Sequence, residues 1–312
     1  MIRDTRPNKG YHVVIGVDQG YGNIKTANEC FRAGLTVYNH EPYFKSDMVF
    51  FNRKYYVIGE GHKTFVLNKD EDEDYYVLTL AAIGKELARE HMDYALIHLA
   101  VGVPLNWLSE QRDRFRRYLM ENREVVFWLN NDRYQIEIEA VEIYPQGFAH
   151  VAPYIIDLTG TTMICDIGNG TINVMKLTNG IASQKDCFTK KFGVNQCMLR
   201  IQQTLLQEYG TPVDEKIIEE VFQTGTTDLG ENALKVIRDE ATRYASEVMD
   251  LLREYEYNPK LMKLHIVGGG GCIIRNFGSY DESRVTINDD IKAAAKGYEY
   301  LAKCKLEGQG ML

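Results

Sequence analysis

Two short loops in this chain carry an aspartate and two glycines in the same spacing, Asp-x-Gly-x-Gly. The first is Asp18-Gln19-Gly20-Tyr21-Gly22, and the second is Asp166-Ile167-Gly168-Asn169-Gly170. Each loop follows an apolar run that is typical of a buried strand. A carboxylate at the end of a strand can hold a hydrated metal ion, and the glycines let backbone N–H groups point at anionic oxygens. The two loops together predict a clamp for a nucleoside triphosphate.

Further side chains beside these loops suit phosphate or metal. Asn23 and Lys25 follow the first loop, and Thr171 follows the second. Lys25 has two interpretations that the residues leave open: its amine reaches phosphate, or it lies on the outer face of the return strand. Because two carboxylates cannot bind a triphosphate directly, we expect Asp18 and Asp166 to hold Mg²⁺ through its water shell.

A third glycine cluster, Gly268-Gly269-Gly270-Gly271, follows the apolar run Leu264–Val267 and precedes a predicted helix. Backbone without side chains lets a base or ribose lie close, and a helix N-terminus favours phosphate. Alone, the cluster could be a flexible turn. In a chain that already has two phosphate loops, it favours nucleotide binding. The glycine spacing matches neither a Rossmann fingerprint nor a Walker A loop.

The elements that must position these loops recur in the same order in both halves of the chain. We expect strands at 12–17, 23–28, 35–38, 48–51, 55–58, 94–103, 124–129 and 134–141, then at 163–166, 172–177, 181–186 and 264–267. Helical spacing predicts helices near 77–88, 108–121, 146–156, 194–208, 215–222, 231–254 and 290–305. The pattern indicates an α/β protein with an internal duplication of architecture.

The composition limits the class of protein. The 312 residues carry a net charge of −8, so binding of free nucleic acid through a global positive field is not expected. Six cysteines without Cys-x-x-Cys spacing are typical of reduced thiols rather than a metal or disulfide framework. No apolar run is long enough to span a bilayer. We expect a cytoplasmic protein without direct nucleic-acid or membrane contact.

The residues at 18–25, 166–171 and 267–270 resemble the phosphate 1, phosphate 2 and adenosine motifs of the actin/Hsp70/sugar-kinase superfamily, in the same order. Within it, the chain is most similar to ParM-like (StbA-type) bacterial actins, the plasmid-segregation ATPases. Residues 141–147 resemble the first connecting segment of that family, and residues 291–298 its second connecting helix. The resemblance implies an actin-like ATPase fold: two similar lobes, each with a mixed sheet flanked by helices, and a nucleotide in the cleft between them. Lobe I would comprise 1–157 plus 290–312, and lobe II 158–289.

The resemblance also implies roles for individual residues. Gln146 matches the position that orients the attacking water, with Asp18 and Asp166 as the other catalytic residues; alternatively, Gln146 only caps a helix. A glutamine is no strong base, so slow hydrolysis is expected. Base and ribose contacts are expected from 192–196, which could also be an ordinary helix start. The implied nucleotide-binding residues are Asp18, Gln19, Gly20, Tyr21, Gly22, Asn23, Lys25, Asp166, Gly168, Asn169, Gly170, Thr171, Gly193, Asn195, Gln196, Gly268, Gly269 and Gly270. At Gln19 and Tyr21, where small hydroxyl residues are common in the family, phosphate contacts would come from the backbone.

The implied function is a filament-forming ATPase that uses ATP (or GTP) and Mg²⁺ and segregates plasmid DNA. Its partners would be further copies of itself, arranged head to tail, and a ParR-like DNA-binding adaptor. One alternative is a small-molecule kinase of the same superfamily, for which the cleft would need a further catalytic aspartate. Another is a chromosomal bacterial actin with a shape or organisational role; many of these carry an apolar membrane anchor, whereas residues 1–11 are polar. A non-polymerising regulator or chaperone-like module is a third alternative.

Overall fold

The computed structural model describes residues 11–43, 47–59, 73–104 and 108–308. The chain divides into two compact units. Unit 1 comprises the described residues within Met1–Val103, Trp107–Pro145 and Lys292–Leu312, and unit 2 those within Pro104–Asn106 and Gln146–Ile291. Residues 146–157, which the sequence grouped with the first lobe, therefore fall in unit 2.

Unit 1 is built on a mixed sheet. Among its described residues, nine strands pair in the order β3-β2-β1-β7-β9-β8-β5-β6-β4. Their bounds are β1 (His12–Gln19), β2 (Asn23–Lys25), β3 (Cys30–Arg32), β4 (Leu35–Tyr38), β5 (Met48–Phe51), β6 (Lys54–Ile58), β7 (Tyr94–Val103), β8 (Glu124–Leu129) and β9 (Asp132–Pro145). β7 runs parallel to both β1 and β9, whereas β2 is antiparallel to β1 and to β3.

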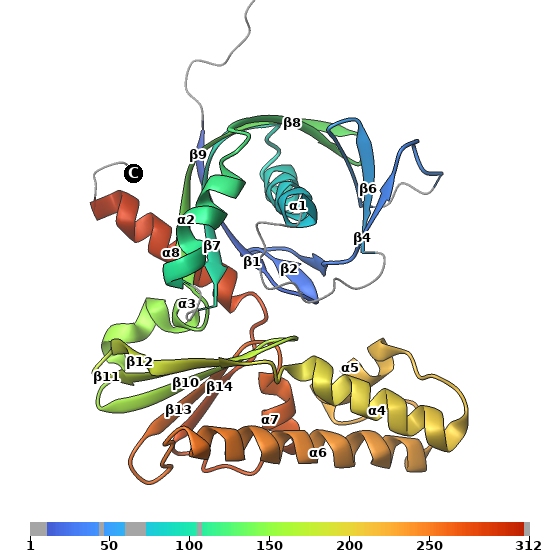
Figure 1. The fold of residues 1–312 in the computed structure, drawn as a ribbon, viewed down its shortest axis with the longest axis vertical. Coiled ribbons are helices and arrows are strands. Elements are labelled where there is room, and N and C mark those ends of the chain that lie inside the picture. Colours follow the sequence, from blue (N-terminus) through green and yellow to red (C-terminus); the bar gives the residue numbers. More distant parts are fainter. Residues whose placement is uncertain (1–10, 44–46, 60–72, 105–107, 309–312) are drawn as a thin grey trace, which may run out of the picture. The chain divides into compact units, whose positions relative to one another are not determined.

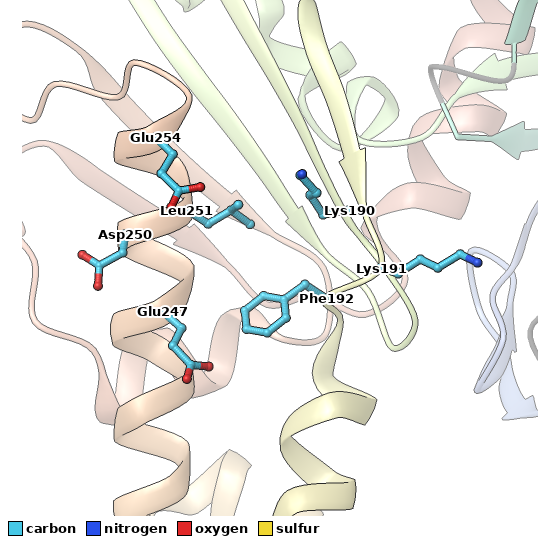
Figure 2. A pocket seen from close by; sticks show the side chains of 7 residues that line it. All are labelled: Lys190, Lys191, Phe192, Glu247, Asp250, Leu251 and Glu254. Carbon is cyan, nitrogen blue, oxygen red and sulfur yellow. The ribbon is translucent and has the colours of Figure 1, made fainter.

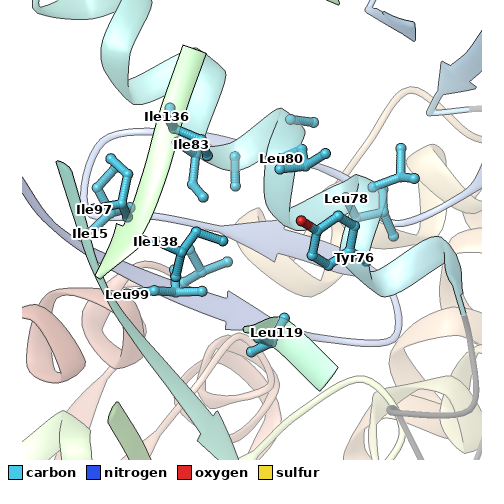
Figure 3. Close-up of a cluster of buried hydrophobic side chains, with 14 of the residues drawn as sticks. Ile15, Tyr76, Leu78, Leu80, Ile83, Ile97, Leu99, Leu119, Ile136 and Ile138 are labelled. Carbon is cyan, nitrogen blue, oxygen red and sulfur yellow. The ribbon is translucent and has the colours of Figure 1, made fainter. Parts of the chain in front are cut away.

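The sheet of unit 1 curls around helix α1 (Glu73–Arg89), and the two form one core (Figure 1). Apolar side chains lie on almost every side of α1, as expected for a helix that is buried all round. They meet apolar side chains of β1, β7 and β9, among them Ile15, Ile97 and Ile138 (Figure 3). The other two helices of the described part of unit 1 are α2 (Leu108–Leu119) and α8 (Ala293–Gly308).

Helix α8 packs on β1 and β7 at two glycines. A Cβ on Gly16 would lie 2.0 Å from the backbone oxygen of Ala295, and one on Gly102 would lie 1.9 Å from the hydroxyl of Tyr298. Both distances are far below van der Waals contact, so larger residues at either position would push α8 off the sheet.

Unit 2 is a smaller sheet with helices on both faces. Among its described residues, five strands pair in the order β12-β11-β10-β13-β14. These are β10 (Thr161–Ile167), β11 (Ile172–Thr178), β12 (Ile181–Lys190), β13 (Lys263–Val267) and β14 (Val285–Asn288). Helices α4 (Val194–Tyr209), α5 (Glu215–Thr224), α6 (Glu231–Glu254) and α7 (Gly271–Phe277) contribute to one core. The short α3 (Phe148–Val151) and the 3₁₀ helix η3 (Ala152–Asp157) contribute to the core on the opposite face.

The predicted duplication is confirmed by strand order and direction. In unit 1 the run β3-β2-β1-β7-β9 has the same connectivity as β12-β11-β10-β13-β14 in unit 2. In each run, the first strand pairs antiparallel with the second and the second with the third. The third strand then pairs parallel with the fourth and the fourth with the fifth. Each run also places its Asp-x-Gly-x-Gly loop at the end of its central strand, β1 or β10.

Some elements differ from the prediction. The helix expected over 146–156 is a single α turn followed by 3₁₀ helix, because Pro153 has no N–H to donate and Gly147 has a φ of 83°. The strand expected at 23–28 ends at Lys25, where a turn at 26–29 follows, and β3 and β14 were not predicted. Of the helices in the described ranges, none is both long and apolar enough to cross a bilayer.

Candidate functional site

In unit 1 the side chains of β1 alternate between its two faces, so Asp18 lies on the opposite face from Val17 and Gln19. Val17 belongs to the core around α1. Gln19 also points toward α1, where its Nε2 donates to Thr79 Oγ1 at 2.5 Å and is fully buried. Asp18 therefore lies on the opposite face of the strand, the face on which Gly16 meets α8. The side chain of Gln19 is therefore engaged inside the fold rather than at the outer face of the loop.

Lys25 is the side chain that the structure brings to Asp18. The two residues are directly opposite each other in the β1–β2 ladder. Lys25 Nζ lies 2.9 Å from Asp18 Oδ2, and the side chains are only 18% and 11% exposed. This pair does not decide between the two interpretations of Lys25, which stay predictions.

The turn between β1 and β2 is narrow. A Cβ on Gly20 would lie 2.7 Å from the backbone oxygen of Asn23, so a side chain there would open the hairpin. Gly22 O accepts a hydrogen bond from the N–H of Ala33 at 3.0 Å, which ties the loop to the residue after β3. Burial raises the pKa of Tyr21 well above its usual value, so its hydroxyl stays protonated.

In unit 2 the alternation along β10 is the same. Cys165 and Ile167 belong to the core with α4 and α6, whereas Ile164 belongs to the core on the other face, with Val151. Asp166 follows Ile164 in this alternation and is 8% exposed. The loop then closes as a hairpin, with the N–H of Gly168 donating to Thr171 O at 2.9 Å. Thr171 itself is buried.

The start of α4 is bound to this loop by backbone contacts. Val194 N–H donates to Gly168 O at 3.0 Å, and Asn195 N–H donates to Asn169 O at 2.9 Å. A Cβ on Gly193 would lie 2.4 Å from Asn169 O, so only glycine allows this approach. Two N–H groups that a helix start leaves without an intrahelical partner therefore hold the phosphate 2 loop in place.

The third glycine cluster reaches Asp166 itself. Gly268 has a φ of +84°, and a Cβ on it would lie 2.5 Å from Asp166 Oδ1. Gly270 N–H donates to Ile167 O at 2.9 Å. The cluster predicted to lie against a base or ribose is thus packed directly on the strand end that carries Asp166.

Gln146 and Gln196 also lie near this centre. Gly147 follows Gln146 in the chain and lies next to Asp166. A Cβ added at Gly147 would lie 3.6 Å from the Cβ of Asp166. Gln196, in the first turn of α4, has a buried Oε1 that accepts no hydrogen bond from the described residues. A buried acceptor without a donor is costly, so this atom suits a ligand N–H or O–H. Gly147 and Gly268 thus approach Asp166 directly, and the start of α4 holds the loop that follows it.

Unit 2 also has a pocket that sequence reasoning missed. It has a volume of about 470 Å³ and lies between the end of β12 and the C-terminal half of α6 (Figure 2). Its lining residues are Lys190, Lys191, Phe192, Glu247, Asp250, Leu251 and Glu254. Phe192, the first residue of the segment expected to contact base and ribose, lines this pocket, whereas the other predicted nucleotide-binding residues do not. Glu247 is already paired with Arg200.

The described residues form no cluster of three or more His, Cys, Asp or Glu side chains that could hold a metal ion. A metal at Asp18 or Asp166 would therefore take most of its ligands from water or from a bound molecule. The six cysteines are free thiols, and burial raises the pKa of Cys165 well above its usual value.

Comparison with known proteins supports the fold. Residues 16–148 match the family model "Actin like proteins N terminal domain". No curated protein matches the chain.

Solved structures match over almost the whole chain. A ParM filament from Clostridium botulinum has a TM-score of 0.74 at 18% identity, covering 94% of this chain and 99% of that chain. The archaeal actin homologue Ta0583, in complex with ADP, has a TM-score of 0.72 at 18% identity, covering 94% and 99%. Bacillus thuringiensis ParM with ATP has a TM-score of 0.71 at 14% identity, covering 96% and 100%. Residues 16–148 therefore resemble the N-terminal domain of actin-like proteins, and the described part of the chain has an actin-like fold.

Proposed function

We propose that this chain is an ATPase that binds ATP with Mg²⁺ and assembles head to tail into filaments. The observation that carries the proposal is the shared geometry of the two aspartates. Each is the second-last residue of the middle strand of its five-strand run, β1 or β10, and is followed two positions later by a glycine. Each lies on the face away from the core that contains α1, or α4 and α6. One triphosphate would engage both the phosphate 1 and the phosphate 2 loop.

Asp18 and Asp166 are the residues that would hold Mg²⁺, through its water shell. When bound, the ion neutralises charge on the phosphates. Mg²⁺ keeps several waters and takes phosphate oxygens as ligands, so it needs only one or two protein carboxylates. Lys25 supplies a positive charge to the phosphates beside Asp18.

Gln146 is proposed to orient the attacking water. Its neighbour Gly147 is packed on Asp166, so a side chain at 146 starts next to the phosphate 2 loop. A glutamine amide can accept and donate a hydrogen bond to water but cannot take its proton at neutral pH. We therefore expect slow hydrolysis. Base or ribose contacts are assigned to 193–196 and 268–270, with the buried Gln196 Oε1 as the acceptor.

Self-association is the second half of the proposal. Its support is the likeness in fold to a ParM filament and to an Alp12 filament. Contacts between two different faces of identical subunits generate an open filament. A nucleotide biases such assembly if it binds one conformation more tightly than the other, so hydrolysis would destabilise the polymer. The cargo would be a plasmid, reached through a ParR-like adaptor, since a net charge of −8 does not favour direct DNA binding.

The test is sedimentation and 90° light scattering of the full chain with ATP–Mg²⁺, ATP–EDTA, ADP and GTP. We expect polymer with ATP–Mg²⁺ and loss of it in Asp166→Asn, which keeps the shape of the side chain. Asp186→Asn is the matched control, because Asp186 lies in β12 of the same unit and pairs only at 3.5 Å with Lys176. A chain that stays monomeric while it phosphorylates an added sugar or acid would show that the filament proposal is wrong.

The plasmid role needs a separate experiment. The small basic DNA-binding protein encoded beside this chain, if present, is added with its DNA site to the pelleting assay. Co-sedimentation of that DNA with the polymer supports the role in segregation. Polymer that forms normally but leaves this protein and its DNA in the supernatant argues for a shape or organisational role instead.

A further inference from the structure

A buried carboxylate on α1 has no place in the site described so far. Glu86 is only 8% exposed, on a helix whose other buried side chains are almost all apolar. A charge in such surroundings is tolerated only if its oxygens are fully hydrogen-bonded. Its partners all come from one turn, residues 26–29 between β2 and β3. Glu86 accepts from the Thr26 hydroxyl, from Asn28 N–H at 3.1 Å and from Asn28 Nδ2 at 2.8 Å.

The turn held by Glu86 is also closed by its own hydrogen bonds. Thr26 N–H donates to Glu29 O at 2.9 Å, and Glu29 N–H donates to Thr26 Oγ1 at 2.8 Å. The turn 26–29 is therefore fixed by hydrogen bonds within itself and by those from the turn to Glu86 of α1. The residue immediately before it is Lys25, whose amine is 2.9 Å from Asp18. Lys25 is the last residue of the three-residue strand β2, and Thr26 is bonded directly to it. A movement of Thr26 would therefore also move Lys25.

A second anchor reaches the same turn from the other end of the chain. Lys292 Nζ donates to the backbone oxygen of Asn28 at 2.5 Å. Lys292 is the first residue of unit 1 after the chain leaves unit 2 at Ile291, and it directly precedes α8. One turn is therefore bound both to the helix inside unit 1 and to the point where the chain returns from unit 2.

We propose that Glu86 and Lys292 are positioning residues that hold Lys25 at the phosphate 1 loop through the turn 26–29. This inference rests on the proposed function, because it assigns Lys25 to phosphate. Glu86 fixes the turn within unit 1. Lys292 makes the position of Lys25 depend on the chain segment that connects the two units, so the affinity for phosphate and the conformation of that segment are coupled.

The test compares Glu86→Gln and Lys292→Met by titration with ATP–Mg²⁺, ADP and adenosine. Glu86→Gln keeps the shape of the side chain but sets an amide N–H₂ against a donor of the turn. Lys292→Met keeps the apolar stem and removes the donor from a half-buried position outside the core, so we expect it to fold even if Glu86→Gln does not. The matched controls are Glu90→Gln, just after α1 on the surface, and Lys303→Met, at an exposed position of α8 whose partner Glu299 lies one turn away.

We expect Glu86→Gln to weaken binding of ATP and ADP about tenfold, Lys292→Met to weaken it about threefold, and neither to change adenosine binding. In a Lys25→Met background both effects should disappear, which a general loss of stability would not produce. Equal losses for adenosine and ATP, or undiminished effects without Lys25, overturn the inference while leaving nucleotide binding intact. A wild-type chain that binds no nucleotide overturns the proposed function, and this inference with it.

Discussion

Gly268→Ala is the substitution whose effect can be worked out most fully. Gly268 has a φ of +84°, which costs an alanine about 1–2 kcal/mol. The new Cβ would also lie 2.5 Å from Asp166 Oδ1 and 2.8 Å from Ile167 O. Since real Cβ atoms stay at least 3.0 Å away, the Asp166 carboxylate must move by at least 3.0 − 2.5 = 0.5 Å. Overpacking of this kind adds about 1–3 kcal/mol.

The control that separates these two costs is Gly225→Ala. Gly225 ends α5 with a φ of +80°, and a Cβ there meets nothing within 4 Å. Gly225→Ala should lower the free energy of unfolding by the backbone cost alone, about 1–2 kcal/mol. Gly268→Ala should lower it by about 2–5 kcal/mol, because overpacking adds to the backbone cost. Urea unfolding measures both variants.

The functional consequence follows from the displacement of Asp166. Half an ångström at a residue that positions Mg²⁺ and phosphate should weaken ATP–Mg²⁺ binding about tenfold in Gly268→Ala. Gly225→Ala should bind as the wild type does. If the two variants are equally stable and bind ATP equally well, the close packing of the glycine cluster on Asp166 has no role in the site, and the reasoning fails.

Three further predictions concern other parts of the fold. Lys25→Met removes the partner that lies 2.9 Å from the largely buried Asp18. We expect weaker ATP binding by calorimetry and a free energy of unfolding in urea that is lower by about 1–3 kcal/mol. Unchanged values in both measurements would refute the pairing. Gly16→Ala must push the backbone of α8 away from β1, so the melting temperature should fall by several degrees, and a crystal structure should show α8 displaced; a variant as stable as the wild type would contradict this packing. The hydrogen bond from Arg200 lowers the pKa of Glu247, so this pair stabilises the fold above the usual glutamate pKa near 4.5 and stops doing so as the pH falls through the lowered value. The gap in melting temperature between wild type and Glu247→Gln should therefore close on acidification, and a constant gap would argue against this linkage.

Much of the local structure follows from the sequence alone. Strand, glycine turn and strand at 12–25 and at 161–178 are set by residues next to one another, because apolar runs favour strands and glycines allow tight turns. The third loop, after 263–267, could be predicted for the same reason. The resemblance to actin-like proteins is carried by these three loops together with residues 141–147 and 291–298. The short 3₁₀ helix after Gly147 and the four-residue β14 could not be predicted, since segments this short carry too little periodicity.

Tertiary structure alone decided what surrounds each aspartate. The approach of Gly268 to Asp166, about 100 positions earlier, depends on the parallel pairing of β10 with β13. That Gln19 turns inward to Thr79 depends on α1 filling the curl of the first sheet. The joining of Glu86 and Lys292 at Asn28 brings together three distant parts of the chain. Local residue types determine strands and turns, but contacts between distant residues depend on strand pairing and core packing, which a single sequence does not reveal.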